Sequence, residues 1–122
     1  MKYAKFSLIV PAFNEEKIIS KKLDNCMSLD YDKGKYEILV IDDYSSDRTA
    51  SIAGRYASKH KIIRLIKNQL SKGKVGCLNT ALKFAKNELI AITDADVVLK
   101  KDILKKSIKP ISKKNIGAIC GI

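Results

Sequence analysis

Short apolar runs alternate with amphipathic segments along most of the chain. The runs cover residues 6–10, 37–41, 62–66, 89–93 and 116–122. Between them, apolar side chains recur three and four positions apart in residues 15–27, 48–59, 75–85 and 102–108. The first pattern predicts five short, buried strands, and the second predicts four helices.

Polar residues beside these segments predict where the helices begin and end. Asn14 is placed as the N-cap of the first helix, with residues 15–16 in its acidic first turn. Asp47 is placed as the N-cap of the second helix. His60, at the polar end of that helix, is expected to be a surface residue or a C-terminal cap. Pro110 is expected to end the fourth helix, because proline lacks a backbone N–H group.

The alternation of strands and helices predicts the fold class. Strands that are apolar on both faces and alternate with helices are typical of βαβ units, in which right-handed crossovers join parallel strands. We therefore predict an α/β fold, namely a Rossmann-like, doubly wound, mostly parallel sheet with helices on both faces. With 122 residues, 46% of them apolar, the chain is expected to form one domain with a substantial core.

The chain is strongly basic: 24 Lys and Arg residues against 13 Asp and Glu give a net charge of +11. This balance favours an anionic partner, such as nucleic acid, a membrane surface or a phosphorylated ligand. Lysines far outnumber arginines and are spread over every predicted helix, whereas base recognition favours arginine, so nucleic acid is disfavoured. A solvated lysine surface is the simplest explanation, and peripheral contact with anionic lipid is a second hypothesis.

The cysteines indicate a cellular compartment. Cys26, Cys77 and Cys120 lie far apart and form no Cys-x-x-Cys pair, which argues against a disulfide framework or a zinc site. We expect buried thiols in a reducing compartment, and hence a cytoplasmic protein, at the cytoplasmic face of the membrane if the lipid hypothesis holds. No apolar run approaches the roughly 20 residues of a membrane-spanning helix.

Acidic residues follow two predicted strands of this otherwise basic chain. Asp42 and Asp43 follow the second strand, and Asp94 and Asp96 follow the fourth. Ligands of open parallel sheets bind at the carboxyl ends of the strands, so these side chains are expected to meet at one edge. Clustered carboxylates repel unless a cation lies between them, and oxygen ligands suit Mg²⁺ or Mn²⁺ bound together with substrate phosphates.

A basic loop, residues 72–74, follows the third strand and precedes a helix. Lysine and a helix N-terminus both favour phosphate, so a metal and a lysine could stabilise the leaving diphosphate of a nucleotide-sugar donor. Singly, each feature has a simpler explanation: Asp-x-Asp as a turn, the lysines as solvated residues, and Phe13 as a residue packed on its own helix. Their combination at one edge favours a ligand site.

Four segments resemble the N-terminal, nucleotide-binding half of a family 2 glycosyltransferase with the GT-A fold. They are Ile-Val-Pro-Ala-Phe-Asn-Glu-Glu at 9–16, Val-Ile-Asp-Asp-Tyr-Ser-Ser-Asp-Arg-Thr at 40–49, Gly-Lys-Val-Gly-Cys-Leu-Asn-Thr-Ala at 73–81, and Thr-Asp-Ala-Asp at 93–96. The resemblance implies inverting transfer of a sugar from a nucleotide-sugar donor, typically a UDP-sugar, to a hydroxyl of a saccharide or lipid-linked acceptor.

By position, the resemblance also implies which residues contact the nucleoside. Pro11, Phe13 and Glu15 would line the base and the ribose. Asp43, with Asp42 beside it, would hydrogen-bond the edge of the base, typically uracil.

The same resemblance implies the ligands of the diphosphate and the metal. Lys74 would lie near the base or the diphosphate. Asp96 would bind Mg²⁺ or Mn²⁺ through the diphosphate, and Asp94 would lie nearer the ribose or a metal-bound water. Tyr44 departs from the family, which usually has glycine there, and is expected to alter that turn or narrow the nucleotide slot.

Family members continue past the point where this sequence ends, and that further stretch carries the acceptor site and a carboxylate general base. After Asp96 the sequence offers Asp102, whose place at a predicted helix start favours capping. We therefore expect a chain that is truncated before the acceptor-binding part, with no catalytic base of its own and little or no sugar transfer.

Two alternatives belong to other classes. A metal-dependent nucleotidyltransferase of similar topology would also use Asp-x-Asp, but it would carry a glycine-rich loop where this chain has residues 11–14, Pro-Ala-Phe-Asn. The same segment argues against a dinucleotide-binding domain, which needs G-x-G-x-x-G there. The second alternative is a non-enzymatic module that binds nucleic acid or an anionic surface through its basic charge.

Overall fold

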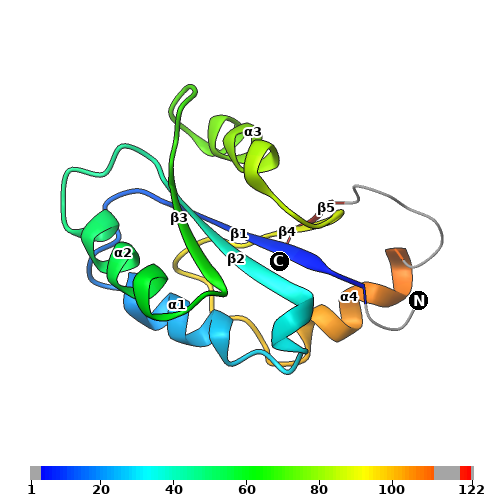
Figure 1. The fold of residues 1–122 in the computed structure, drawn as a ribbon. Coiled ribbons are helices and arrows are strands. Elements are labelled where there is room, and N and C mark those ends of the chain that lie inside the picture. The colour runs from blue at the N-terminus through cyan, green and yellow to red at the C-terminus, as the bar shows by residue number, and fades with distance from the viewer. Residues whose placement is uncertain (1–3, 112–118, 122) are drawn as a thin grey trace.

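The computed structural model describes residues 4–111 and 119–121. The strands are β1 (Phe6–Ala12), β2 (Tyr36–Asp42), β3 (Ile63–Lys67), β4 (Leu89–Ile92) and β5 (Ile119–Gly121). The helices are α1 (Ile19–Met27), α2 (Thr49–Lys59), α3 (Lys74–Phe84) and α4 (Ile103–Ile111), with a short 3₁₀ helix, η1 (Lys33–Lys35), before β2. Strands and helices therefore alternate as the apolar pattern predicts (Figure 1).

The sheet has the strand order β3-β2-β1-β4-β5, and every neighbouring pair is parallel. In its register Ala12 lies opposite Asp42, and Asp42 lies opposite Lys67. The last residues of β1, β2 and β3 are thus in one row, so the connections that follow them leave from the same edge. The predicted α/β class and parallel, Rossmann-like sheet are confirmed.

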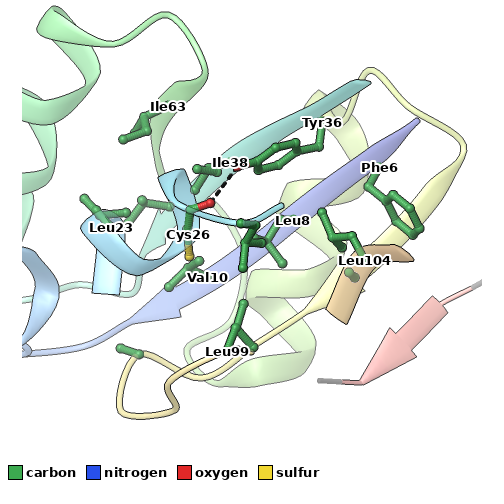
Figure 2. Close-up of a cluster of buried hydrophobic side chains, with 14 of the residues drawn as sticks. Phe6, Leu8, Val10, Leu23, Cys26, Tyr36, Ile38, Ile63, Leu99 and Leu104 are labelled. Atoms are coloured by element: carbon green, nitrogen blue, oxygen red, sulfur yellow. Dashed lines mark hydrogen bonds between the residues drawn. The ribbon is translucent and has the colours of Figure 1, made fainter. Parts of the chain in front are cut away.

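Helices cover both faces of the sheet, with α1, α2 and α4 on one face and α3 on the other (Figure 1). Side chains of a strand alternate between faces, so Leu8 enters the larger core and Ile9 the smaller one. Figure 2 shows the larger core, where the Tyr36 hydroxyl donates to the Cys26 carbonyl at 2.7 Å. This bond satisfies a polar group that burial would otherwise leave without a partner.

The start of α1 differs from the prediction. The helix begins at Ile19, and Asn14 is not its N-cap. Asn14 has a φ of 50°, and its side-chain oxygen accepts a hydrogen bond from the backbone of Ser46 at 2.8 Å. The acidic residues 15–16 precede the helix rather than forming its first turn. Cap preference is a local property, and here a partner 32 positions away in the sequence outweighs it.

Two further helix ends also differ. The N-cap of α2 is Arg48, and Asp47, one position earlier, accepts the backbone N–H of Thr49 at 2.9 Å. Asp47 therefore accepts a hydrogen bond from the first turn of α2, although it lies just outside the helix. Helix α4 continues through Pro110 to Ile111, because a proline near a helix end forfeits one hydrogen bond while its φ remains compatible with the helix.

Other predictions about single residues agree with the structure. His60 is exposed and is the C-cap residue of α2. Cys26 and Cys77 are buried. Burial raises the pKa of the Cys26 thiol to about 11 and, together with the charge of Asp43, that of Cys77 to about 12, so neither is a ready nucleophile at neutral pH.

Some predictions fall outside the described residues. These are the side chain of Cys120 and, from the last predicted strand, residues 116–118 and 122. Within the described part of the chain, no helix combines the length and the apolarity that crossing a bilayer requires.

Leu8→Ala tests the larger core. Leu8 is 0% exposed, so its truncation should lower the free energy of unfolding by about 2–5 kcal/mol. The matched control is Leu82→Ala on α3, the same truncation at a side chain that is 45% exposed, with an expected cost below about 1 kcal/mol. Urea denaturation followed by circular dichroism measures both, and equal losses would contradict this assignment of the core.

Candidate functional site

An open pocket of about 340 Å³ lies at the edge where the strands end. Four connections contribute to it, namely those that follow β1, β2, β3 and β4. Its lining residues are Pro11, Ala12, Phe13, Glu15, Asp43, Gly73, Lys74, Asp94, Ala95 and Asp96. The structure thus brings together every predicted site residue except Asp42.

Asp42 does not line this pocket, although it adjoins Asp43 in the sequence. As the last residue of β2 it is 5% exposed, and its carboxylate faces the backbone N–H of Ser45 at 3.4 Å. Consecutive side chains of an extended chain point in opposite directions, which separates the two carboxylates. Asp42 therefore contacts the turn at Ser45, whereas Asp43 lines the pocket.

Asp43 joins the β2 end to the basic loop after β3. Its carboxylate accepts from the Asn68 side chain at 2.9 Å and from the backbone of Gly73 at 3.0 Å. The Asn68 side-chain oxygen in turn accepts from the Thr80 hydroxyl of α3 at 2.7 Å. Asn68 is a site-supporting residue that the sequence reading did not identify, because an asparagine in a polar loop carries no signal of its distant partners.

Tyr44 has a φ of 63°, in the left-handed region that favours glycine. The turn thus keeps the backbone conformation typical of a glycine position. The Tyr44 hydroxyl donates to the carbonyl of Leu70 at 2.7 Å and so adds a second link to the loop after β3. The side chain is 52% exposed.

The β1 and β2 connections are also cross-linked to each other. The Asn14 N–H donates to the Ser45 hydroxyl at 2.9 Å, and the Glu15 N–H donates to the Thr49 hydroxyl at 2.7 Å. Asp47 accepts from the backbone of Glu16 at 3.2 Å. These bonds fix the backbone of the segment that carries Phe13 and Glu15.

The Asp-x-Asp turn presents two carboxylates around a buried alanine. Ala95 is 6% exposed and packs into the larger core, while the flanking Asp94 and Asp96 line the pocket. The Lys74 Nζ lies 2.8 Å from the Asp94 Oδ1, and the hydrogen bond between them raises the pKa of Lys74. Partial burial and the charge of Asp96 raise the pKa of Glu15, with smaller effects from other nearby aspartates.

The donor set fits a divalent cation that is shared with a phosphorylated ligand. In the parts of the chain that the structure describes, no group of three or more His, Cys, Asp or Glu side chains could hold a metal ion. Asp94 and Asp96 supply only carboxylate oxygens to an open pocket, and Mg²⁺ typically binds through one or two carboxylates plus substrate phosphates.

Phe13, which lines the pocket, contacts Lys72 of the basic loop. Phe13 is 42% exposed and belongs to neither of the two hydrophobic cores. The Lys72 ammonium lies 3.6 Å from the centre of the Phe13 ring, a cation–π contact. This contact links the β1 connection to the basic loop after β3.

Comparison with known proteins identifies the family. The model of glycosyl transferase family 2 matches residues 7–122. The chain belongs to this family. It is 35% identical over 115 residues to the beta-monoglucosyldiacylglycerol synthase of Trichormus variabilis, covering 93% of this chain and 25% of that protein. The chain therefore spans about a quarter of that relative's length.

Two solved glycosyltransferase structures share the fold. The mannosyltransferase PcManGT from Pyrobaculum calidifontis, in complex with GDP-Man and Mn²⁺, has a TM-score of 0.82 and 36% identity over 90% of this chain and 33% of that one. Residues 1–349 of S. aureus TarS, in complex with UDP-GlcNAc, have a TM-score of 0.75 and 33% identity over 89% of this chain and 31% of that one. The resemblance seen in the four segments is confirmed, whereas the nucleotidyltransferase and nucleic-acid alternatives gain no support.

Exchanging Tyr44 tests the left-handed turn. Alanine and glycine both remove the hydroxyl bond to Leu70, but only glycine adopts a φ of 63° without a steric cost. Tyr44→Gly should therefore be more stable than Tyr44→Ala by about 1 kcal/mol, the reverse of the order in a helix or strand. Thermal or urea unfolding of the two variants measures the difference. An alanine variant as stable as the glycine variant would contradict the left-handed backbone conformation at position 44.

Proposed function

We propose that this chain is the donor-binding part of a family 2 glycosyltransferase and binds a nucleotide sugar together with Mg²⁺ or Mn²⁺. The observation that carries the proposal is the pocket itself, where an aromatic ring, a lysine and four carboxylates converge from four connections. In the complete enzyme, the sugar would be transferred with inversion to an acceptor hydroxyl.

The nucleoside would occupy the part of the pocket formed by the β1 and β2 connections. Pro11, Phe13 and Glu15 would line the base and ribose. The Asp43 carboxylate has capacity beyond its two hydrogen bonds within the chain and would accept an N–H from the base edge. Uracil and guanine carry a ring N–H on that edge, whereas adenine and cytosine offer only an exocyclic amino group there. We favour a UDP-sugar, with a GDP-sugar second.

The diphosphate would lie between the Asp-x-Asp turn and the basic loop. Asp96, with Asp94 beside it, would hold the divalent cation through the phosphates. When bound, the metal neutralises the charge that develops on the leaving nucleoside diphosphate. Lys74 would exchange its pairing with Asp94 for a phosphate oxygen and add a second positive charge there.

The acceptor site and the general base are proposed to lie outside residues 1–122. Asp102 is the only acidic residue among the described residues after Asp96. It pairs with Lys106 of α4 at 3.4 Å and does not line the pocket. A lipid acceptor is suggested by the diacylglycerol in the name of the Trichormus relative. The lysine-rich surface would then rest on the anionic cytoplasmic face of a membrane.

Nucleotide binding by the 122-residue chain tests the proposal. Isothermal titration with UDP, GDP, ADP and CDP, each with and without Mn²⁺, should show the tightest binding for UDP and at least a tenfold gain from the metal. Asp96→Ala should abolish most of that gain, since loss of a metal ligand typically costs a factor of ten or more.

Asp30→Ala is the matched control, because Asp30 is an exposed aspartate paired with Lys105 away from the pocket. It should bind UDP and Mn²⁺ like the unaltered chain. Indifference of the unaltered chain to all four nucleotides would overturn the proposal, and equal effects of the two alanine variants would overturn the role of Asp96.

A further inference from the structure

Lys22 is a buried lysine directly behind the Asp-x-Asp turn. It lies on α1 and is 3% exposed, whereas the neighbouring Lys21 is exposed. Its ammonium donates to the Thr93 hydroxyl at 2.7 Å and to the Val97 carbonyl at 2.5 Å. Residues 93 and 97 are the positions immediately before and after the segment Asp94-Ala95-Asp96. One ammonium group therefore joins both ends of the turn that carries the proposed metal ligands.

The rest of the connection is anchored in the same way. One helical turn after Lys22, the Asn25 side chain donates to the Leu99 carbonyl at 3.0 Å and accepts from the Leu99 N–H at 2.7 Å. The turn's own backbone contributes a bond from the Val97 N–H to the Asp94 carbonyl at 3.2 Å. Helix α1 thus fixes a connection that lies outside the regular strands and helices.

A lysine is a costly choice for this position if packing alone were needed. Burial removes the ammonium group from water, and this desolvation lowers the pKa of Lys22, against the opposing effects of nearby Cys26, Asp94 and Asp96. An apolar residue would fill the space without that cost. What lysine adds is a pair of strong hydrogen bonds and a positive charge behind two carboxylates.

We propose that Lys22 is a positioning residue: it holds the Asp94-Ala95-Asp96 turn in the conformation that binds the divalent cation with the nucleotide diphosphate. This inference rests on the proposed function. Without the Lys22 bonds, the turn would sample other conformations, and the cation would have to order it on binding. Supporting groups of this kind typically change metal affinity by a factor of 10 to 100.

Lys22→Met tests this role, because methionine keeps much of the side-chain length but removes the donors and the charge. Lys21→Met is the matched control, the same change at the adjacent exposed lysine. UDP affinity is measured by titration with and without Mn²⁺. In Lys22→Met, the factor by which Mn²⁺ raises UDP affinity should be at least about tenfold smaller, while the metal-free affinity changes less than about twofold. Lys21→Met should keep the full gain.

Hydrogen exchange gives a readout that needs no ligand. The backbone amides of Val97 and Leu99 should exchange faster in Lys22→Met than in Lys21→Met, while those of β1 remain protected. Unchanged exchange together with an unchanged metal-dependent gain would overturn the inference. Equal loss of UDP binding with and without Mn²⁺ would also overturn it, because that pattern indicates a general structural defect.

A second variant covers the case in which Lys22→Met does not fold. Thr93→Val removes one acceptor of the Lys22 ammonium with little change in shape, and it should lower the metal-dependent gain by about threefold or more. A folded Thr93→Val variant with the full gain would overturn the inference. If the unaltered chain shows no metal-dependent binding, the proposed function fails, and the exchange rates alone then decide whether Lys22 orders the turn.

Discussion

The parallel pairing of β1 with β2 on one side and β4 on the other is the constraint on which the site depends. Because all three strands run in the same direction, the segments that follow them leave the sheet at one edge. Phe13, Asp43 and Asp96, which are separated by tens of residues in the sequence, reach one pocket for this reason. An antiparallel neighbour of β1 would send its connection to the opposite edge.

The sheet brings the connections together, but side-chain hydrogen bonds to backbone give them their shape. Asn14, Asp43 and Lys22 each bind a backbone group of a segment far away in the sequence. Because these partners are backbone groups, the bonds fix loop conformation rather than simply adding contact area. The chain as a whole is strongly basic. The proposed chemistry nevertheless depends on a small group of aspartates and Glu15 at this edge of the sheet.

Local patterns in the sequence were sufficient for the elements and for the acidic edge with its basic loop, because apolar periodicity and strand ends are local properties. The other pocket residues, such as Pro11 and Phe13, were predicted from the family resemblance. Local patterns were not sufficient where a distant partner decides. Asn14 has every feature of an N-cap but bonds to Ser46 instead, and Asp42 and Asp43 look equivalent until the strand separates them. Lys22 belongs to no motif that distinguishes it from the other lysines, although it lies three positions after Ile19, on the buried side of α1. A charged residue at an apolar position of a helix was the available signal.

Paramagnetic broadening tests the central claim most directly, namely that a divalent cation and a nucleotide bind together at the carboxyl edge of the sheet. Small amounts of Mn²⁺ added to the ¹⁵N-labelled chain with UDP should broaden the amide signals around residues 11–15, 43–44, 73–74 and 93–97. Signals of the basic surface at the opposite end of the strands, around Lys33 and Lys61, should stay sharp. Broadening centred on that surface, or spread evenly over the chain, would contradict the account.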